Sequence, residues 1–173
     1  MEEASEDIQN RISELSDVAR KQLSRMAALC SRKEYCSSDI KNKLSKKDLS
    51  SDEIEIILQK LYKDKYLSDK RYAAAFAREK SALSGWGRNK ITFALRGKKI
   101  DSADIENALS EIDKKKAEEK FYNVLKRKWK QLEKEEDIQK KTVKLIKFAM
   151  SRGYAYDEIS DAMKILIKNE SIE

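Results

Sequence analysis

Apolar residues recur along this chain at intervals of three and four positions, rather than two. An interval of three or four is typical of one face of an α-helix, whereas an interval of two is typical of a β-strand. Proline, the residue that most strongly interrupts helices, is absent from all 173 residues. We therefore predict an all-α fold.

The helical pattern repeats with a period near 50 residues. Residues 91–109 align without gaps with residues 40–58 and with residues 145–163, and five positions are apolar in all three copies. A period of this size indicates stacked units, each too small to bury its apolar face alone. We predict three tandem three-helix repeats in an elongated, curved array. The expected divisions are an acidic N-terminal extension at residues 1–18 and repeats at residues 19–66, 67–113 and 114–173.

The N-terminal segment has apolar residues at helical spacing, namely Ile8, Ile12, Leu15 and Val18. This spacing fits an additional helix, and it equally fits an arm that the following helices only partly order. The sequence leaves both alternatives open.

Polar residues predict where several helices begin. Ser50 followed by Glu53 has the spacing of a capping box, in which the two side chains satisfy backbone N–H groups at a helix start. Ser37 or Ser38 is expected to cap the preceding helix, and Asp69 the first helix of the second repeat. That helix is expected to carry Tyr72, Ala75, Phe76 and Glu79 on one side and to end near residues 84–87.

Similar signals mark later helix ends. Asp101 and Asp104 repeat the spacing of the capping box, whereas the corresponding place in the third repeat has Ala155, with Glu158 keeping the carboxylate. Gly153 is expected to end a helix in the left-handed conformation. Trp86, between two glycines, fits either a packed core residue or an exposed platform for a ligand, and we favour packing.

The charge distribution suggests a polyanionic partner. The net charge is +7, but residues 1–20 contain two basic and six acidic residues, and residues 114–173 contain sixteen and eleven. Basic excess favours binding of nucleic acid or of an acidic protein surface. Lysine-rich helices that are simply solvated remain an alternative.

Several chemistries are excluded or disfavoured. The chain contains no histidine, which excludes imidazole catalysis and histidine metal ligands. Cys30 and Cys36 are too few for a zinc site and are expected to be ordinary thiols. The glycines fit no phosphate-binding loop, and we expect no metal site in the acidic cluster at residues 133–137. We therefore predict a binding protein without catalytic residues, cofactor or metal, located in the cytoplasm because no apolar run is long enough to span a membrane.

Particular residues resemble the RecX family of recombination regulators. The earlier part of the resemblance is the run Ala28 to Ser37, followed by Ile40 and Leu44. The central part comprises Tyr66-Leu67, Asp69, Arg71-Tyr72-Ala73, Phe76, Trp86-Gly87-Arg88, Lys90-Ile91, Leu95, Lys98 and Ile100. The resemblance covers about residues 19–168 and is strongest over the first two repeats. Where the family commonly has Lys-Gly-Ile, this chain has Lys98-Lys99-Ile100, so the left-handed turn is expected either to shift to Gly97 or to be strained.

The resemblance implies a monomeric regulator that binds the RecA recombinase and its filament on single-stranded DNA. Such proteins inhibit recombinase ATPase and strand exchange during recombination and DNA repair. Direct contact with single-stranded DNA is left open. A direct nucleic-acid-binding helical module and a generic helical scaffold are the alternatives.

We expect basic residues of the second and third repeats to contact the partner or DNA. Arginine among them suits bidentate pairing with carboxylate or phosphate. The expected residues are Arg71, Arg78, Arg88, Lys90, Arg96, Lys98, Lys99, Lys126, Lys130, Lys140, Lys144 and Lys147.

Overall fold

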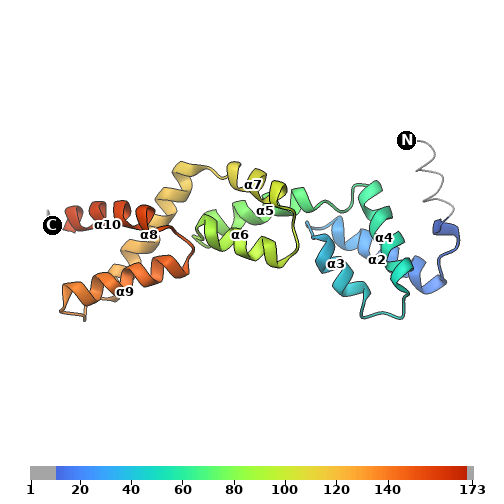
Figure 1. The fold of residues 1–173 in the computed structure, drawn as a ribbon, viewed down its shortest axis with the longest axis horizontal. Coiled ribbons are helices and arrows are strands. Elements are labelled where there is room, and N and C mark those ends of the chain that lie inside the picture. The colour runs from blue at the N-terminus through green and yellow to red at the C-terminus, as the bar shows by residue number, and fades with distance from the viewer. Residues whose placement is uncertain (1–10, 171–173) are drawn as a thin grey trace.

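The computed structural model describes residues 11–170, and within this range the chain consists of α-helices joined by short connections, with no β-strand. The helices form three trios that follow one another along an elongated molecule (Figure 1). The first trio contains α2 (Asp17–Cys30), α3 (Ser37–Leu44) and α4 (Ser51–Lys63). The second contains α5 (Asp69–Ala82), α6 (Arg88–Gly97) and α7 (Ser102–Ser110). The third contains α8 (Lys114–Gln131), α9 (Ile138–Ser151) and α10 (Tyr156–Glu170).

The all-α prediction is confirmed, whereas the exact residue boundaries of the repeats stay a prediction. None of the helices in the described part of the chain has the length and apolar character needed to cross a membrane.

The aligned apolar positions lie in the cores of the trios. All are buried except Leu49, which is partly buried. In the first trio they are Ile40, Leu44, Leu49, Ile54 and Leu58; in the second, Ile91, Leu95, Ile100, Ile105 and Leu109; in the third, Leu145, Ala149, Tyr154, Ile159 and Met163. The repeated pattern therefore reflects three similar hydrophobic cores.

The segment before α2 packs against the first trio. Leu15 is only 2% exposed and belongs to the first core, whereas Val18 is exposed. Ser16 caps α2 by accepting a hydrogen bond from the Ala19 N–H, and it donates to Glu53 on α4. Ile8 lies outside the described residues.

Two expected helix starts are wrong, and both errors involve Asp69. The N-cap of α5 is Ser68, which accepts from the Arg71 N–H, so Asp69 is the first helical residue. The N-cap of α3 is Cys36, which makes no side-chain capping bond. Asp69 compensates from the second trio, because its carboxylate accepts hydrogen bonds from the Ser37 N–H (2.7 Å) and hydroxyl (2.6 Å).

Other start signals agree with the sequence. Ser50 and Glu53 form the full capping box at α4. Asp101 caps α7 by accepting from the Ala103 N–H. Glu158 accepts from the Ala155 N–H (2.7 Å), which is the carboxylate half of the box.

The buried face of α5 consists of the small side chains Ala73, Ala74, Ala77 and Ser81. These allow α7 to pack closely, which larger side chains would prevent. The expected residues Tyr72 and Phe76 are partly buried at the edge of this core, and Phe76 meets the Trp86 ring edge to face at 6.1 Å. Trp86 thus packs as favoured.

The two cysteines are free and buried, so they pack as small apolar side chains. Burial raises the pKa of both thiols above the usual value.

The left-handed turn after α6 falls on Lys99, whose φ is 60°, and not on Gly97, which is the last residue of that helix. The alternative that placed the turn at Gly97 is therefore wrong. The corresponding residue after α9 is Gly153, whose φ is 89° as expected for a left-handed cap.

The second and third trios are joined by backbone contacts. The Gly87 N–H donates to the Arg152 carbonyl (2.8 Å), and the Asn89 N–H donates to the Gly153 carbonyl (3.1 Å). A Cβ on Gly87 would lie 2.4 Å from the Gly153 oxygen, so only glycine permits this approach. The C-terminal end of α9 therefore meets the N-terminal end of α6, an orientation that the helix dipoles favour.

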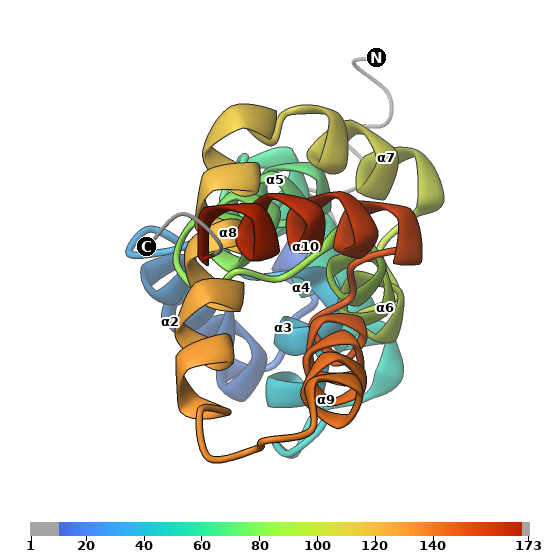
Figure 2. The same ribbon diagram turned by 90° about the vertical axis from the view of Figure 1, so that its left-hand side faces the viewer.

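The second helices of the trios follow one another along the long axis, in the order α9, α6 and α3 (Figures 1 and 2). At the other end of α6, the Lys98 ammonium donates to Asp39 in the first turn of α3 at 2.6 Å. We call this row of three helices the spine.

Candidate partner-binding surface

Several of the predicted partner residues connect the first two trios. The Arg71 guanidinium pairs with Glu34 at 2.8 Å and donates to the Lys65 carbonyl at 2.9 Å. Lys98 pairs with Asp39, and this hydrogen bond raises the pKa of the lysine above its usual value. Arg71 and Lys98 thus connect the first and second trios to each other.

Other predicted partner residues stabilise the second trio and its contact with the third. Arg78 pairs with Glu111 at 3.1 Å, and Arg88 donates to the Leu109 carbonyl at 3.2 Å. The Lys90 ammonium donates to the Ser151 carbonyl at the end of α9 (3.0 Å). Reversing the charge of Lys90 would therefore disturb the junction as well as any partner contact.

Two predicted residues of α9 pair with acidic residues that precede the helix. Lys140 lies 3.6 Å from Asp137, and Lys144 forms a short ion pair with Glu135. The hydrogen bond from Lys144 holds the pKa of Glu135 below its usual value. The expected acidic cluster thus neutralises part of the basic face of α9.

The remaining predicted residues have no ion pair with any described residue. They lie on or directly after α6, α8 and α9, and only Lys126 among them is partly buried. An unpaired surface cation keeps its charge available to a partner. These residues are Arg96, Lys99, Lys126, Lys130 and Lys147.

Several apolar residues on the spine are also exposed, among them Phe93 and Met150, which sequence reasoning missed. Phe93 on α6 is 80% exposed and Met150 on α9 is 55% exposed. Phe93 lies one turn before Arg96, and Met150 lies one turn after Lys147, so each helix presents an apolar side chain next to an unpaired cation. The available signal was the position of Phe93 outside the apolar stripe formed by Ile91 and Leu95. Large apolar side chains beside arginine are typical anchors of protein interfaces.

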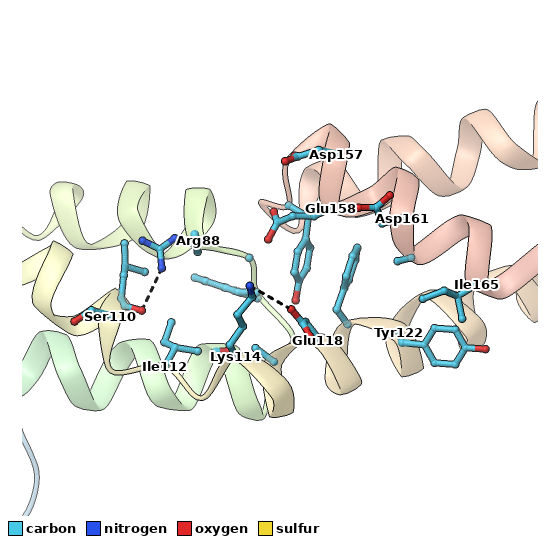
Figure 3. A pocket seen from close by; sticks show the side chains of 18 residues that line it. Arg88, Ser110, Ile112, Lys114, Glu118, Tyr122, Asp157, Glu158, Asp161 and Ile165 are labelled. Atoms are coloured by element: carbon cyan, nitrogen blue, oxygen red, sulfur yellow. Dashed lines mark hydrogen bonds and ion pairs between the residues drawn. The ribbon is translucent and has the colours of Figure 1, made fainter.

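A cleft of about 710 Å³ lies between the second and third trios (Figure 3). Its apolar lining includes Trp86, Phe121 and Tyr154, and the last two rings stack with centroids 3.5 Å apart. Burial raises the pKa of Tyr154 to about 12, so the phenol is neutral at physiological pH.

Charged side chains of both signs surround this cleft. Lys114 lies 4.0 Å from Glu118, and the side chains of Asp157, Glu158 and Asp161 on α10 lie across from them (Figure 3). Among the described residues there is no group of three or more Cys, Asp or Glu side chains arranged to hold a metal ion. Aromatic side chains line this cleft and charged side chains of both signs surround it, an arrangement that is suited to binding a ligand.

Comparison with known proteins gives matches over most of the chain. The family model for the second three-helix domain of RecX matches residues 68–109, and the model for its third three-helix domain matches residues 116–163. The crystal structure of RecX from Lactobacillus salivarius superimposes with a TM-score of 0.75, covering 88% of this chain and 98% of that one at 24% identity. That similarity supports the fold.

Curated relatives carry the same name. Regulatory protein RecX of Clostridium botulinum (strain Eklund 17B / Type B) is 36% identical over 132 residues, which are 76% of this chain and 61% of the relative. The chain thus spans less than two thirds of that relative's length. Regulatory protein RecX of Actinobacillus pleuropneumoniae serotype 5b (strain L20) is 33% identical over 141 residues, which are 79% of this chain and 87% of the relative. This chain belongs to the RecX family of regulatory proteins.

Proposed function

We propose that this chain binds the RecA recombinase and its filament on single-stranded DNA, and that it inhibits recombinase ATPase and strand exchange in recombination and DNA repair. It acts by binding and has no catalytic activity of its own. We further propose that it is a monomer in the cytoplasm. Membership of a family named for regulation supports the general role.

The observation that carries the proposal is the end-to-end joining of the trios. Backbone hydrogen bonds fix α9 against α6, and the Lys98–Asp39 pair fixes α6 against α3. An elongated body of similar units can contact neighbouring subunits of a helical filament at once. Each contact then raises the effective concentration of the next, which strengthens binding without any single strong site.

The contact surface that we propose is the exposed side of the spine. Arg96 and Lys147 have no ion pair with described residues, and each lies beside an exposed apolar side chain, Phe93 or Met150. Pairing with an acidic recombinase surface would orient the complex, and burial of Phe93 would supply affinity. Inhibition follows to the extent that the bound chain favours one filament conformation or obstructs a second strand.

The test is binding to recombinase filaments assembled on immobilised single-stranded DNA, measured by surface plasmon resonance. The variant Arg96→Glu with Lys147→Glu should lose at least about tenfold in affinity, roughly 1.4 kcal/mol. Neither side chain holds a described internal contact, so melting should not change.

The matched control is Lys21→Glu with Arg25→Glu on α2. These exposed residues lie one turn apart in the first trio, and the change in net charge is the same. The control should bind like the unmodified chain. Equal losses in both variants would indicate a diffuse charge effect and would remove the spine from the contact surface.

A further inference from the structure

A second groove of about 430 Å³ lies beside α8, on the surface between the end of α5 and the end of α9. None of its lining residues is acidic, and four are basic. The lining consists of Leu83, Ser84, Lys120, Val124, Arg127, Lys128, Gln131, Phe148 and Arg152. None of these four cations was among the residues predicted from the sequence.

Neutral groups hold two cations of this groove, Arg152 and Lys128, in place. The Arg152 guanidinium donates to the Ser84 carbonyl at 2.6 Å, and its Cζ lies 5.1 Å from the centre of the Phe148 ring. The Lys128 ammonium lies 5.3 Å from the same ring. Because carbonyls and aromatic rings do not neutralise a cation, the positive charge remains available.

The position of Ser84 depends on the turn that follows it. Gly85 has a φ of 61°, and a Cβ there would lie 3.0 Å from Val124. This turn brings the Ser84 carbonyl to Arg152, so the second trio contributes one wall of the groove. The groove is therefore formed by the same junction that joins the trios.

The shape and charge of the groove favour an extended anion over a small one. One side of α8 lines the groove through Lys120, Val124, Arg127 and Gln131. Gln131 follows Lys120 by eleven residues, so these side chains extend over ~16 Å of helix. Four cations without a carboxylate repel one another, and a chain of phosphates would relieve that repulsion over the whole length. Leu83, at one wall, is 72% exposed and offers an apolar surface to a base.

We propose that this groove binds the sugar-phosphate backbone of a single nucleic-acid strand. The proposed regulation of the recombinase does not require this contact, so the inference goes beyond it. Lys120 and Arg127 contact phosphates directly, while Lys128 and Arg152 are held in position by Phe148. An acidic protein surface is the competing occupant.

The test uses two variants with equal changes in charge. Lys120→Gln with Arg127→Gln alters the groove, whereas Lys21→Gln with Arg25→Gln alters the exposed side of α2 in the first trio. Lys21 and Arg25 have no ion pair among the described residues, and Arg127 donates only to the Asn123 carbonyl of its own helix. Binding to a labelled oligothymidine is measured by fluorescence anisotropy over a range of salt concentrations, and helicity by circular dichroism.

The groove variant should bind more weakly, and the slope of log affinity against log salt should decrease in magnitude by about 1.4, since each phosphate contact on a single strand contributes ~0.7. The control should keep the slope of the unmodified chain. If the double variant loses helicity, Arg127→Gln alone should reduce the slope by about 0.7.

Three results would overturn the inference: no binding of the unmodified chain to the oligonucleotide, equal slope changes in both variants, or unchanged DNA binding with weakened filament binding in the groove variant. The last result would assign the groove to a protein surface and leave the proposed recombinase function intact. Loss of DNA binding with unaltered filament binding would support the groove and separate the two activities.

Discussion

At the scale of the residue, Lys99 shows a local conflict between sequence and conformation. Its φ is 60°, which costs an L-residue about 1–2 kcal/mol, whereas the third trio has Gly153 at the same place. The Lys99 ammonium makes no ion pair with any described residue that would offset this cost. A side chain kept at a strained position is consistent with a role in contacting the partner.

We predict that Lys99→Gly stabilises the protein by about 0.5–1 kcal/mol, because relief of the strained φ exceeds the added flexibility of the unfolded chain. Urea denaturation measures the difference. Lys99→Ala removes the same charge but keeps the strain, so it should bring no such gain. Equal stabilisation by alanine would show that charge, and not backbone conformation, is responsible.

Residue-level features were predictable from the sequence when their partners are close along the chain. Ser50 and Glu53 are three residues apart, and their capping box forms as predicted. Asp69 was misassigned because its main partner, Ser37, lies 32 residues earlier. A carboxylate that caps a helix of another trio has no local spacing that could identify it.

At the scale of the element, the contact between α9 and α6 determines how the second and third trios are placed. The N-terminal N–H groups of α6 have no side-chain cap, because Gly87 precedes the helix. The N–H groups of Gly87 and of Asn89 instead donate to carbonyls at the end of α9. The junction thus satisfies donors and acceptors that helix ends leave unpaired. It also requires that Gly87 has no Cβ.

We predict that Gly87→Ala destabilises the protein by about 2 kcal/mol or more, because the added methyl group would overlap the Gly153 carbonyl and separate the two helix ends. Chemical denaturation measures the loss. Gly97→Ala is the matched control, since a Cβ there meets no atom within 4 Å. It should be neutral or stabilise by up to about 1 kcal/mol. Similar stability of Gly87→Ala and Gly97→Ala would contradict the close contact between α6 and α9 at Gly87.

Elements were predicted better than their contacts. The stripe formed by Ile91 and Leu95 identified α6 and its buried face, because side-chain periodicity reports burial directly. The small buried face of α5 was missed, because alanine contributes little to such a pattern although it permits close packing. The α9–α6 junction was also missed, since contacts between backbone groups leave no side-chain signature.

At the scale of the whole molecule, the charge pattern acts in two ways. Arg71 and Lys98 hold the trios together through Glu34 and Asp39, so part of the basic excess is structural. Arg96 and Lys147 remain without an ion pair among the described residues. Sequence reasoning selected all four for the same role. Pairing between residues that are distant along the chain decides which cations stay available, and the sequence alone does not show that pairing. The basic groove on α8 was missed for the same reason, since its walls come from three helices.

The most direct test of the proposed function is recombinase ATPase on single-stranded DNA, followed by phosphate release as this chain is titrated in. The salt concentration is set so that the chain alone does not bind the strand appreciably. The end-to-end array predicts half-inhibition well below one chain per recombinase subunit, because each chain contacts several subunits or blocks growth of the filament. Unchanged ATPase at an excess of the chain would contradict the account.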